Sequence, residues 1–340
     1  MIRNALPGAR ALGFGAIALA LLAGCAAPGS PGSSPTAAPS AAPQPTAAAT
    51  SAPAPTAQPQ PTAQPQPTAA ATSAPAPTTQ PQPSGDVDPA VQVVADYYVA
   101  ISQQQFDAAY ALWANGGAAS GQTLEQFKAG FARTAAASLR LGQPKPTSNA
   151  VAVPIELIAI SNDADAQKPQ IVQQFRGIYT AAATADGWRL TSASVEEVRD
   201  GALPPAELAD PAQTLQNYYA AINSQQIAHA YTFWGNNGQN SNQRYVDFAR
   251  GFANTAQVSA ALGTPQIGAA AGSIYAEIPA LVSAKQRDGS QQTFCGTYTM
   301  RKLNVPPFDQ LGWHIEKADM AQHAAVPAAD AARVLANGCK

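Results

Sequence analysis

Apolar positions along the chain follow a helical period first and an extended period afterwards. Val91, Val94 and Tyr98 recur at three- and four-residue steps, which places their side chains on one face of a helix. Residues 106–113 and 124–131 repeat this spacing over shorter lengths. The pattern therefore predicts three consecutive helices, each with an apolar face that needs a partner to cover it.

The period changes to two after these helices. Val151, Val153 and Ile155 alternate with other residues, which predicts a strand with one buried face. Pro154 interrupts this strand, and a proline inside a strand indicates an edge position or a bulge because it cannot donate a ladder hydrogen bond. Two further strands are predicted in QQFRGIYTA and GWRLTSASV. Helices followed by an antiparallel sheet indicate an α+β domain.

A second copy of this pattern follows the first. Residues 97–145 align with residues 218–266 at a constant shift of 121 positions, and nearly half of the aligned residues are identical. The second strand signal lies at 276–282, where Pro279 takes the place of Pro154, and strands follow in QTFCGTYTM and GWHIEKADM. We therefore expect two tandem α+β units, each with its own apolar interior.

The start of each copy carries a helix-initiation signal. Asp-Pro-Ala occurs at Asp88 and again at Asp210. Aspartate is a favourable N-cap, and proline suits the first helical position because its missing N–H needs no partner there. We expect both aspartates to cap the first helix of their unit. The predicted boundaries are 86–200 for the first unit, 207–326 for the second and 327–340 for a C-terminal helical tail.

Both copies resemble the nuclear-transport-factor-2-like (SnoaL-like) superfamily. The resemblance rests on element order and length, on the Tyr-Tyr-x-Ala-Ile opening at Tyr97 and Tyr218, and on the Gly-Trp of the closing strand, and it covers 86–196 and 207–320. It implies a curved sheet folded around helices into a cone-shaped domain with a central pocket. Because the superfamily includes isomerases, dehydratases and adaptor domains, the resemblance implies no particular activity.

Aromatic residues shared by the two copies have two interpretations. Large aromatic side chains supply much of the burial that a small domain needs, so core packing is the simpler one. The resemblance implies that the same side chains could line a cone pocket. Tyr97 and Tyr218 lie on the opposite helical face from Ile101 and Ile222, so they could meet the other unit instead. The shared candidates are Tyr98, Tyr110, Trp113, Tyr179 and Trp188, with Tyr219, Tyr231, Trp234, Tyr298 and Trp313 as their counterparts.

The chain begins with a secretory signal. Arg3 and Arg10 accompany an apolar run that is shorter than the roughly 20 residues a membrane-spanning helix needs. The run ends in Leu22-Ala23-Gly24-Cys25, which resembles the bacterial lipobox, where the cysteine becomes the diacylated first residue of the mature chain. We therefore expect a signal peptide over 1–24 and a lipid anchor on Cys25. The alternative is an ordinary signal peptide with an incidental cysteine.

Residues 25–85 predict a disordered tether. From Ala26 to Gly85 the chain has no charged residue and holds 16 of its 30 prolines, and TAAATSAPAPT occurs twice. Such a composition has almost nothing to bury, so it cannot offset the conformational entropy lost on ordering. Its prolines favour extended polyproline II. The tether would therefore act as a stalk between the membrane and the folded units.

Charge excludes some function classes. Without Arg3 and Arg10 of the signal peptide, 17 basic residues oppose 21 acidic residues, and no basic cluster is present. This argues against nucleic acid as a partner and against electrostatic attraction to anionic lipid. We expect an extracytoplasmic protein held at a bacterial membrane, in the cell envelope, by the lipid on Cys25 alone. Ala26 lacks the acidic signal that retains some lipoproteins at an inner membrane, which favours the outer one.

The sequence carries no signature of catalysis, metal binding or a cofactor. The copies share hardly any acidic residue at a plausible pocket position, so an enzyme would have to use one copy. Glu277, which matches Ala152, is then the first candidate, and a solvent-facing strand residue is its plainer interpretation. His229, His314 and His323 lack the close spacing typical of metal ligands. A nucleophile elbow and a phosphate-binding loop are also absent from the sequence.

Two cysteines remain once Cys25 is assigned to lipid. Cys295 lies in a predicted strand of the second copy, and Cys339 is the penultimate residue. A pair of cysteines in an oxidising compartment predicts a disulfide, which would pin the C-terminal helix to the second unit. Two free thiols are the alternative.

These features predict a lipid-anchored, non-catalytic binding or scaffolding protein with two pocketed domains. The connector RDGALPPAEL is short and contains two prolines, which favours one rigid unit. Its partner could be an envelope protein, a cell-wall polymer or a small apolar ligand. The alternatives are an isomerase- or dehydratase-type enzyme that uses one cone pocket, and a pair of spacers that project a surface patch.

Overall fold

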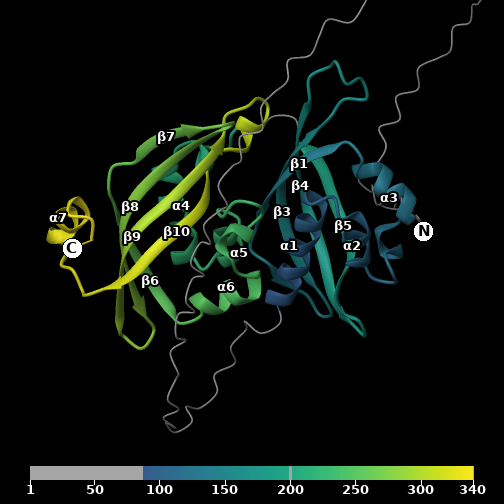
Figure 1. The fold of residues 1–340 in the computed structure, drawn as a ribbon. Helices are drawn as coiled ribbons and strands as arrows, with labels where there is room; N and C mark the ends of the chain where they lie inside the picture. Colours follow the sequence, from purple (N-terminus) through teal and green to yellow (C-terminus); the bar gives the residue numbers. More distant parts are fainter. Residues whose placement is uncertain (1–86, 199–200, 340) are drawn as a thin grey trace, which may run out of the picture. The chain divides into compact units, whose positions relative to one another are not determined.

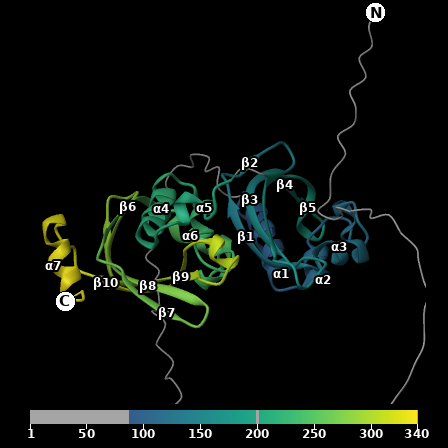
Figure 2. The same ribbon diagram turned by 90° about the horizontal axis from the view of Figure 1, so that it is seen from above.

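The computed structural model describes residues 87–198 and 201–339 (Figure 1). The predicted signal peptide, Cys25 and the tether lie outside these residues and stay predictions. The described residues form two α+β units, which we call the first repeat (87–198) and the second repeat (201–339). In each repeat, helices pack against a curved antiparallel sheet, as the sequence predicts (Figure 1, Figure 2).

The first repeat places three helices before five strands. Its sheet has the order β1-β3-β4-β5, and the short β2 also pairs with β3. All pairings are antiparallel. The elements are α1 (Asp88–Ser102), α2 (Phe106–Ala111), η1 (Ala118–Ser120), α3 (Leu124–Phe131), β1 (Thr134–Leu141), β2 (Lys145–Pro146), β3 (Val151–Ser161), β4 (Ile171–Thr184) and β5 (Gly187–Val198).

The second repeat has the same order of elements and adds a C-terminal helix. Its sheet has the order β6-β8-β9-β10, and β7 also pairs with β8. The elements are η2 (Ala206–Leu208), α4 (Pro211–Asn223), α5 (Ile227–Tyr231), η3 (Gln239–Ser241), α6 (Tyr245–Phe252), β6 (Thr255–Leu262), β7 (Gln266–Ala270), β8 (Ser273–Gln286), β9 (Gln291–Leu303), η4 (Phe308–Leu311), β10 (His314–His323), η5 (Ala328–Asp330) and α7 (Ala331–Ala336).

Pro154 lies where the neighbour of β3 changes. Strand β1 ends opposite Ile155 and β2 begins opposite Ala152, so Pro154 lies in the gap between these two neighbours, where a ladder N–H is not needed. The chain leaving β1 crosses this break closely: the Gly142 N–H donates to the Pro154 carbonyl at 2.8 Å, and a Cβ on Gly142 would lie 2.9 Å from the Pro154 Cβ. Pro279 occupies the same position in β8. The proline thus sits at a local strand edge, one of the two positions that the sequence indicates.

Four strands were not predicted: β1 and β6, and the shorter β2 and β7. Strand β1, TAAASLRL, pairs with the whole second half of β3, and β6 occupies the same position in the second repeat. Both strands are rich in alanine, which has a weak strand preference and blurs a period-two pattern. These two strands therefore form because they pair with β3 and β8, whose apolar residues alternate clearly.

The two predicted caps have different outcomes. Asp210 is the N-cap of α4, and its carboxylate accepts a hydrogen bond from the Gln213 N–H at 2.9 Å. Asp88 instead lies inside the first turn of α1, where Val87 is the N-cap. Its carboxylate accepts a hydrogen bond from the Tyr245 hydroxyl of the second repeat at 3.3 Å. The predicted cap at Asp88 is therefore wrong, because a contact between the repeats takes the side chain.

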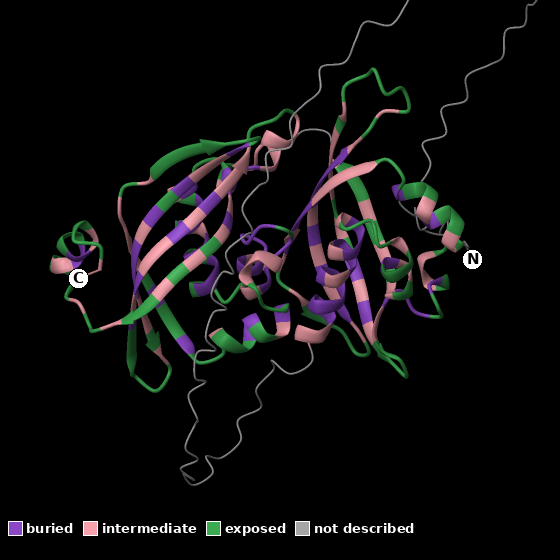
Figure 3. Ribbon diagram, in the orientation of Figure 1, coloured by how far each residue is buried: buried purple, intermediate pink, exposed green. Residues whose placement is uncertain are grey.

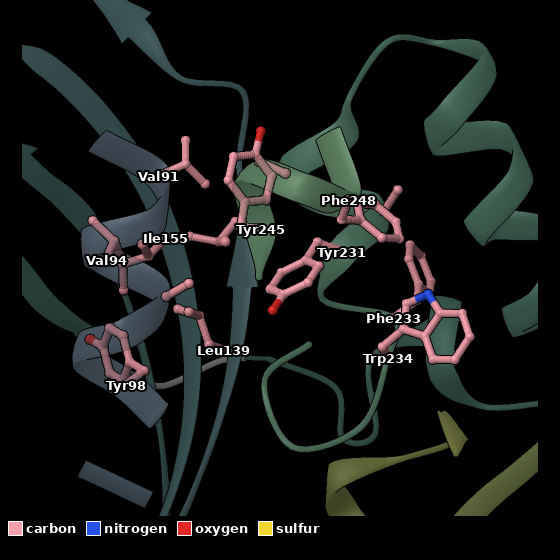
Figure 4. Packing of buried hydrophobic residues seen from close by; sticks show 14 of the residues in the cluster. Val91, Val94, Tyr98, Leu139, Ile155, Tyr231, Phe233, Trp234, Tyr245 and Phe248 are labelled. Atoms are coloured by element: carbon pink, nitrogen blue, oxygen red, sulfur yellow. The ribbon is translucent and has the colours of Figure 1, made fainter. Parts of the chain in front are cut away.

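The apolar interiors of the two repeats are continuous. Each sheet covers its own helices, but one cluster of buried side chains contains residues of both sheets, of α1 and of α6. Figure 3 shows buried residues on α1 and on the strands of both sheets. Figure 4 shows Tyr245 on the side of α1 that carries Val91. The expectation of two separate interiors was wrong in this respect.

The outer faces of the two sheets carry opposite chemistry at matching positions. In the first repeat, Arg140, Glu156, Arg176 and Glu196 are cross-strand partners in one row. Arg140 pairs with Glu156, and Arg176 Nε lies 3.6 Å from Glu156 Oε1. A row of alternating charge suits a face that stays open to water. The matching row of the second repeat is Ala261, Leu281, Cys295 and Ala321.

The C-terminal helix covers this apolar row. Ala331 and Val334 of α7 are buried against Leu281 and Cys295, which are themselves 5% and 3% exposed. A disulfide joins Cys295 to Cys339, with 5.6 Å between their Cα atoms, as the cysteine count predicts. The bond and the apolar contacts together hold the helix on the sheet.

Candidate functional site

The cone interiors are packed with their own aromatic side chains. In the first repeat Tyr97, Tyr98, Trp113 and Tyr179 are at most 6% exposed, and their rings meet mainly edge to face at centroid distances of 5.1 to 6.0 Å. The hydroxyls of Tyr98 and Tyr179 lie 3.1 Å apart, so each satisfies the other. In the second repeat the matching pair is Tyr219 and Tyr298, at 2.6 Å.

The remaining predicted aromatics surround these pairs. Tyr110 and Tyr231 donate hydrogen bonds to the carbonyls of Gln122 and Gln243, at 2.8 and 2.9 Å. All ten predicted residues are buried or half-buried within the apolar cluster, and the cavity described below is lined by other residues. Tyr97 and Tyr218 also pack inside their own repeats, so the expectation that they meet the other unit was wrong.

The cone interiors offer little acid–base chemistry. Removal from water raises the pKa of Tyr98 and Tyr179 far above the ordinary tyrosine value, and the neighbouring tyrosine adds to this. Both hydroxyls therefore stay protonated at neutral pH. Glu277, the catalytic candidate, is exposed on β8. Among residues 87–198 and 201–339, no group of three His, Cys, Asp or Glu side chains is placed to hold a metal.

Helix α1 contacts α6 of the second repeat and so forms part of the junction between the repeats. Gln92 is 6% exposed, and its Oε1 accepts a hydrogen bond from the Val246 N–H of α6 at 3.1 Å. Its Nε2 donates to Asp96 Oδ1 at 2.7 Å, and Arg244 Nη2 lies 3.3 Å from Asp96 Oδ2. The buried amide is thus satisfied on both sides, which favours one relative position of α1 and α6.

A second buried amide crosses the junction from the loop after α5. Asn237 is 7% exposed and has a left-handed backbone, with φ of 54°. Its Oδ1 accepts a hydrogen bond from the Leu139 N–H of β1 at 2.9 Å, and its Nδ2 donates to Ser102 Oγ at 3.0 Å. The first copy has Gly116 here, also at positive φ. Asparagine tolerates this conformation and adds a side chain that reaches the other repeat.

An ion cluster joins the repeats near the connector. Arg140 Nε lies 2.5 Å from Glu207 Oε1, and His229 Nε2 lies 3.1 Å from Glu207 Oε2. Burial by itself would raise the pKa of Glu207, but His229 and Arg140 beside it hold that pKa below its usual value. The carboxylate therefore stays charged at neutral pH, and the charges of the cluster offset one another.

A polar cavity of about 390 Å³ lies at the junction. The end of α1 and β1 form one side of it, and the loop after α5, β9 and β10 form the other. Its lining contains no Phe, Tyr or Trp side chain. The polar residues in the lining are Ser102, Ser138, Thr232, Asn236, Asn237, Asn240, Arg301, His314 and Glu316.

Hydrogen bonds to neighbouring side chains hold the polar groups of the cavity. Glu316 Oε2 accepts a hydrogen bond from Asn240 Nδ2 at 2.8 Å, and Arg301 Nε donates to Ser273 Oγ at 3.1 Å. Ser138 Oγ lies 3.5 Å from His314 Nε2, across the junction. Glu316 and Arg301 use only one oxygen and one nitrogen in these hydrogen bonds, so their other polar atoms can bind a ligand.

Sequence reasoning missed this cavity, although the repeat contains a signal for it. At five positions where the second copy has a polar side chain in the lining, the first copy has a smaller one, whereas Asn236 and His314 match the polar Asn115 and Arg189. The five differences point to a function of the second copy alone. The pairs are Arg301 with Ala182, Glu316 with Thr191, Asn240 with Ala119, Asn237 with Gly116 and Thr232 with Ala111.

Comparisons with known proteins do not assign this chain to a family. No family model matches the chain, and no curated protein matches it. Among solved structures, the chain is similar to a candidate dehydratase of the NTF2-like family from Streptomyces avermitilis, with 18% identity and a TM-score of 0.30 over 35% of this chain and 100% of that one. It is also similar to an Ntf2-like protein involved in plasmid conjugation, with 8% identity and a TM-score of 0.21 over 69% and 96%. Such likenesses carry no conclusion about activity.

Replacing Asn237 with glycine tests the amide that crosses the junction. Asn237→Gly keeps a residue that accepts positive φ but leaves the buried Leu139 N–H without its acceptor, which costs about 1–3 kcal/mol. The control is Asn236→Gly, because Asn236 has the same φ of 54° but is exposed. Urea unfolding of both variants gives the difference in unfolding free energy. Equal losses in the two variants would contradict a special role for Asn237.

The enclosed His314 predicts an acid-dependent loss of stability. Removal from water lowers the pKa of His314 from its ordinary value of 6.5 to about 4, against the opposing effects of the Gly312 backbone and Glu207. Above pH 6.5 the ring is neutral in both states. Between pH 6.5 and 4 only the unfolded chain takes up the proton, so the unfolding free energy falls by about 3 kcal/mol through this group.

The pH dependence is checked by comparing wild type with His314→Gln. Unfolding free energies are measured from pH 7 to pH 4, and the variant should lose less stability over this range. The charged groups around the ring, Glu207, Arg301 and Glu316, are present in both proteins and cancel in the comparison. His323→Gln, at the far end of β10, serves as the control and should follow wild type. Identical slopes for His314→Gln and wild type would contradict the assignment.

Proposed function

We propose that this protein is a lipid-anchored, non-catalytic binding protein of a bacterial cell envelope. The anchor is Cys25, the stalk is formed by residues 25–85, and the two repeats form the binding unit. No helix among residues 87–198 and 201–339 is both long and apolar enough to cross a membrane. The lipobox-like Leu22-Ala23-Gly24-Cys25 supports attachment through lipid.

The binding site of this proposal is the cavity at the junction. The observation that carries it is the enclosure of several polar side chains around about 390 Å³, a volume in the range of small-molecule sites. The lining is polar, so the proposed ligand is a small polar molecule. This differs from the three partners that the sequence left open, which were an envelope protein, a cell-wall polymer and a small apolar ligand.

The packing inside the cones favours binding over catalysis. Isomerase-type chemistry needs a group that is charged or titrates near neutral pH beside the substrate. In both repeats the aromatic pairs fill the region where such a substrate would lie, and the nearest candidate acid, Glu277, is exposed. This supports a structural role for the cone interiors.

Replacing Cys25 tests the anchor. Cys25→Ser removes the thiol that would carry the diacyl group, so the protein should move from the membrane fraction to the soluble fraction after detergent-free lysis. Cys339→Ser also replaces one cysteine, and breaks the Cys295–Cys339 disulfide, but leaves Cys25 in place, so it should remain in the membrane fraction. Membrane retention of Cys25→Ser would contradict the proposed attachment.

Filling the cavity tests the binding site. Ala136→Leu adds bulk to its wall, whereas Gln257→Leu makes a comparable change at the matching exposed position of the second repeat. Thermal unfolding is followed with glycine, acetate, glucose and a sterol as probes. At least one polar probe should raise the melting temperature saturably, the effect should be lost in Ala136→Leu only, and mass spectrometry should recover the probe unchanged. Stabilisation by the sterol alone, or turnover of a probe, would contradict the proposal.

A further inference from the structure

Two opposite charges stand side by side in the wall of the cavity. Arg301 Nη1 on β9 and Glu316 Oε1 on β10 lie 3.9 Å apart, which is too far for a hydrogen bond. Their side chains are 39% and 34% exposed, so both remain accessible to a molecule in the cavity. The two groups are therefore close enough to bind one small ligand together, but they do not hydrogen-bond to each other.

Each of the two charged groups is held in place from its far side. Arg301 Nε donates to Ser273 Oγ at 3.1 Å, and the guanidinium carbon lies 6.0 Å from the centre of the Tyr275 ring. Glu316 Oε2 accepts a hydrogen bond from Asn240 Nδ2 at 2.8 Å. These contacts orient the two side chains and leave Arg301 Nη2 and Glu316 Oε1 without a hydrogen bond to a described residue.

The arrangement selects the charge of the ligand. A simple anion would meet Arg301 but be repelled by Glu316, and a simple cation would face the reverse situation. A molecule that carries both charges a few bonds apart can pair with both side chains at once. It would supply the hydrogen bonds that Arg301 and Glu316 do not make to each other. The matching positions of the first repeat are Ala182 and Thr191, so the charge pair is specific to the second repeat.

The residues of the lining also restrict which cationic group the ligand can carry. A quaternary ammonium is recognised by a cage of Trp, Tyr or Phe faces, and nucleobases stack on such rings, but the cavity wall has no Phe, Tyr or Trp side chain. A primary ammonium, by contrast, donates hydrogen bonds that a carboxylate and neutral acceptors can take. Glu316 Oε1 and the nearby His314 Nε2 and Ser138 Oγ are such acceptors.

We propose that this cavity binds a small zwitterion of the α- or β-amino-acid class, with its carboxylate on Arg301 and its primary ammonium on Glu316. The inference rests on the proposed function and names the ligand class of the same site. Asn237 and Asn240 also line the cavity.

Calorimetric titration of the soluble Cys25→Ser chain tests the ligand class. The probes are glycine, β-alanine and L-alanine, with acetate and methylammonium as the separate halves and glycine betaine as the quaternary analogue. At least one amino acid should bind saturably, and the halves and the betaine should bind more weakly by about tenfold or more, because each leaves Arg301 or Glu316 without a hydrogen-bonded charge partner. Equal binding of the halves would overturn the proposal.

Two charge-removing variants test the roles of the side chains. Arg301→Gln and Glu316→Gln should each weaken amino-acid binding by about tenfold or more. Lys317→Gln and Asp319→Asn on the same strand are the matched controls, because their side chains are 62% and 63% exposed and pair with each other. The controls should bind as wild type does, and unchanged binding in both Arg301→Gln and Glu316→Gln would overturn the assignment.

The outcomes also separate this inference from the proposed function. If glycine, β-alanine and L-alanine fail to bind while acetate or glucose binds and loses its binding in Ala136→Leu, the ligand class is wrong and the cavity stands as a binding site. If no probe binds, or if Ala136→Leu binds as wild type does, both proposals are wrong.

Discussion

The burial of helix α1 on all sides makes the two repeats one unit. One face of α1 packs on its own sheet and the other meets α6, so none of its residues is fully exposed. Its counterpart α4 keeps Gln213 and Gln216 in water. Because the two buried amides at this junction would be costly to leave unpaired, the position of the second repeat against α1 is specified by hydrogen bonding as well as by apolar contact.

The junction is formed by one surface of the first repeat and a different surface of the second repeat. The same contact cannot form again with a further copy of the chain. A head-to-tail contact between identical units can repeat without closing. Here the matching surfaces have changed: α4 offers Asn217 where α1 has Asp96, and the first repeat has Thr123 where the second has Arg244. The ion pair between Asp96 and Arg244 therefore has no equivalent at the free ends.

Residues that are identical in the two repeats have a different role from residues that differ between them. The shared aromatics became the two cores, whereas residues that differ built the junction, the cavity and the cover of the second sheet. The outer row shows this most simply. Arg176 in an open, charged row corresponds to Cys295 in an apolar row that α7 covers, and the disulfide keeps that cover in place. Function is therefore expected where the copies diverge.

The sequence by itself determined the features that depend on local periodicity: two tandem α+β units, most of their strands, and the pairing of the only two cysteines left after Cys25. Tertiary structure decided what local pattern cannot encode, namely which face meets which partner. It formed β1 from an alanine-rich stretch, drew Asp88 from its cap to Tyr245, and enclosed Ser138, Asn237 and His314, which lie far apart in the chain. A periodic pattern reports that a face is buried, but the group that buries it is chosen by long-range packing and hydrogen-bond satisfaction.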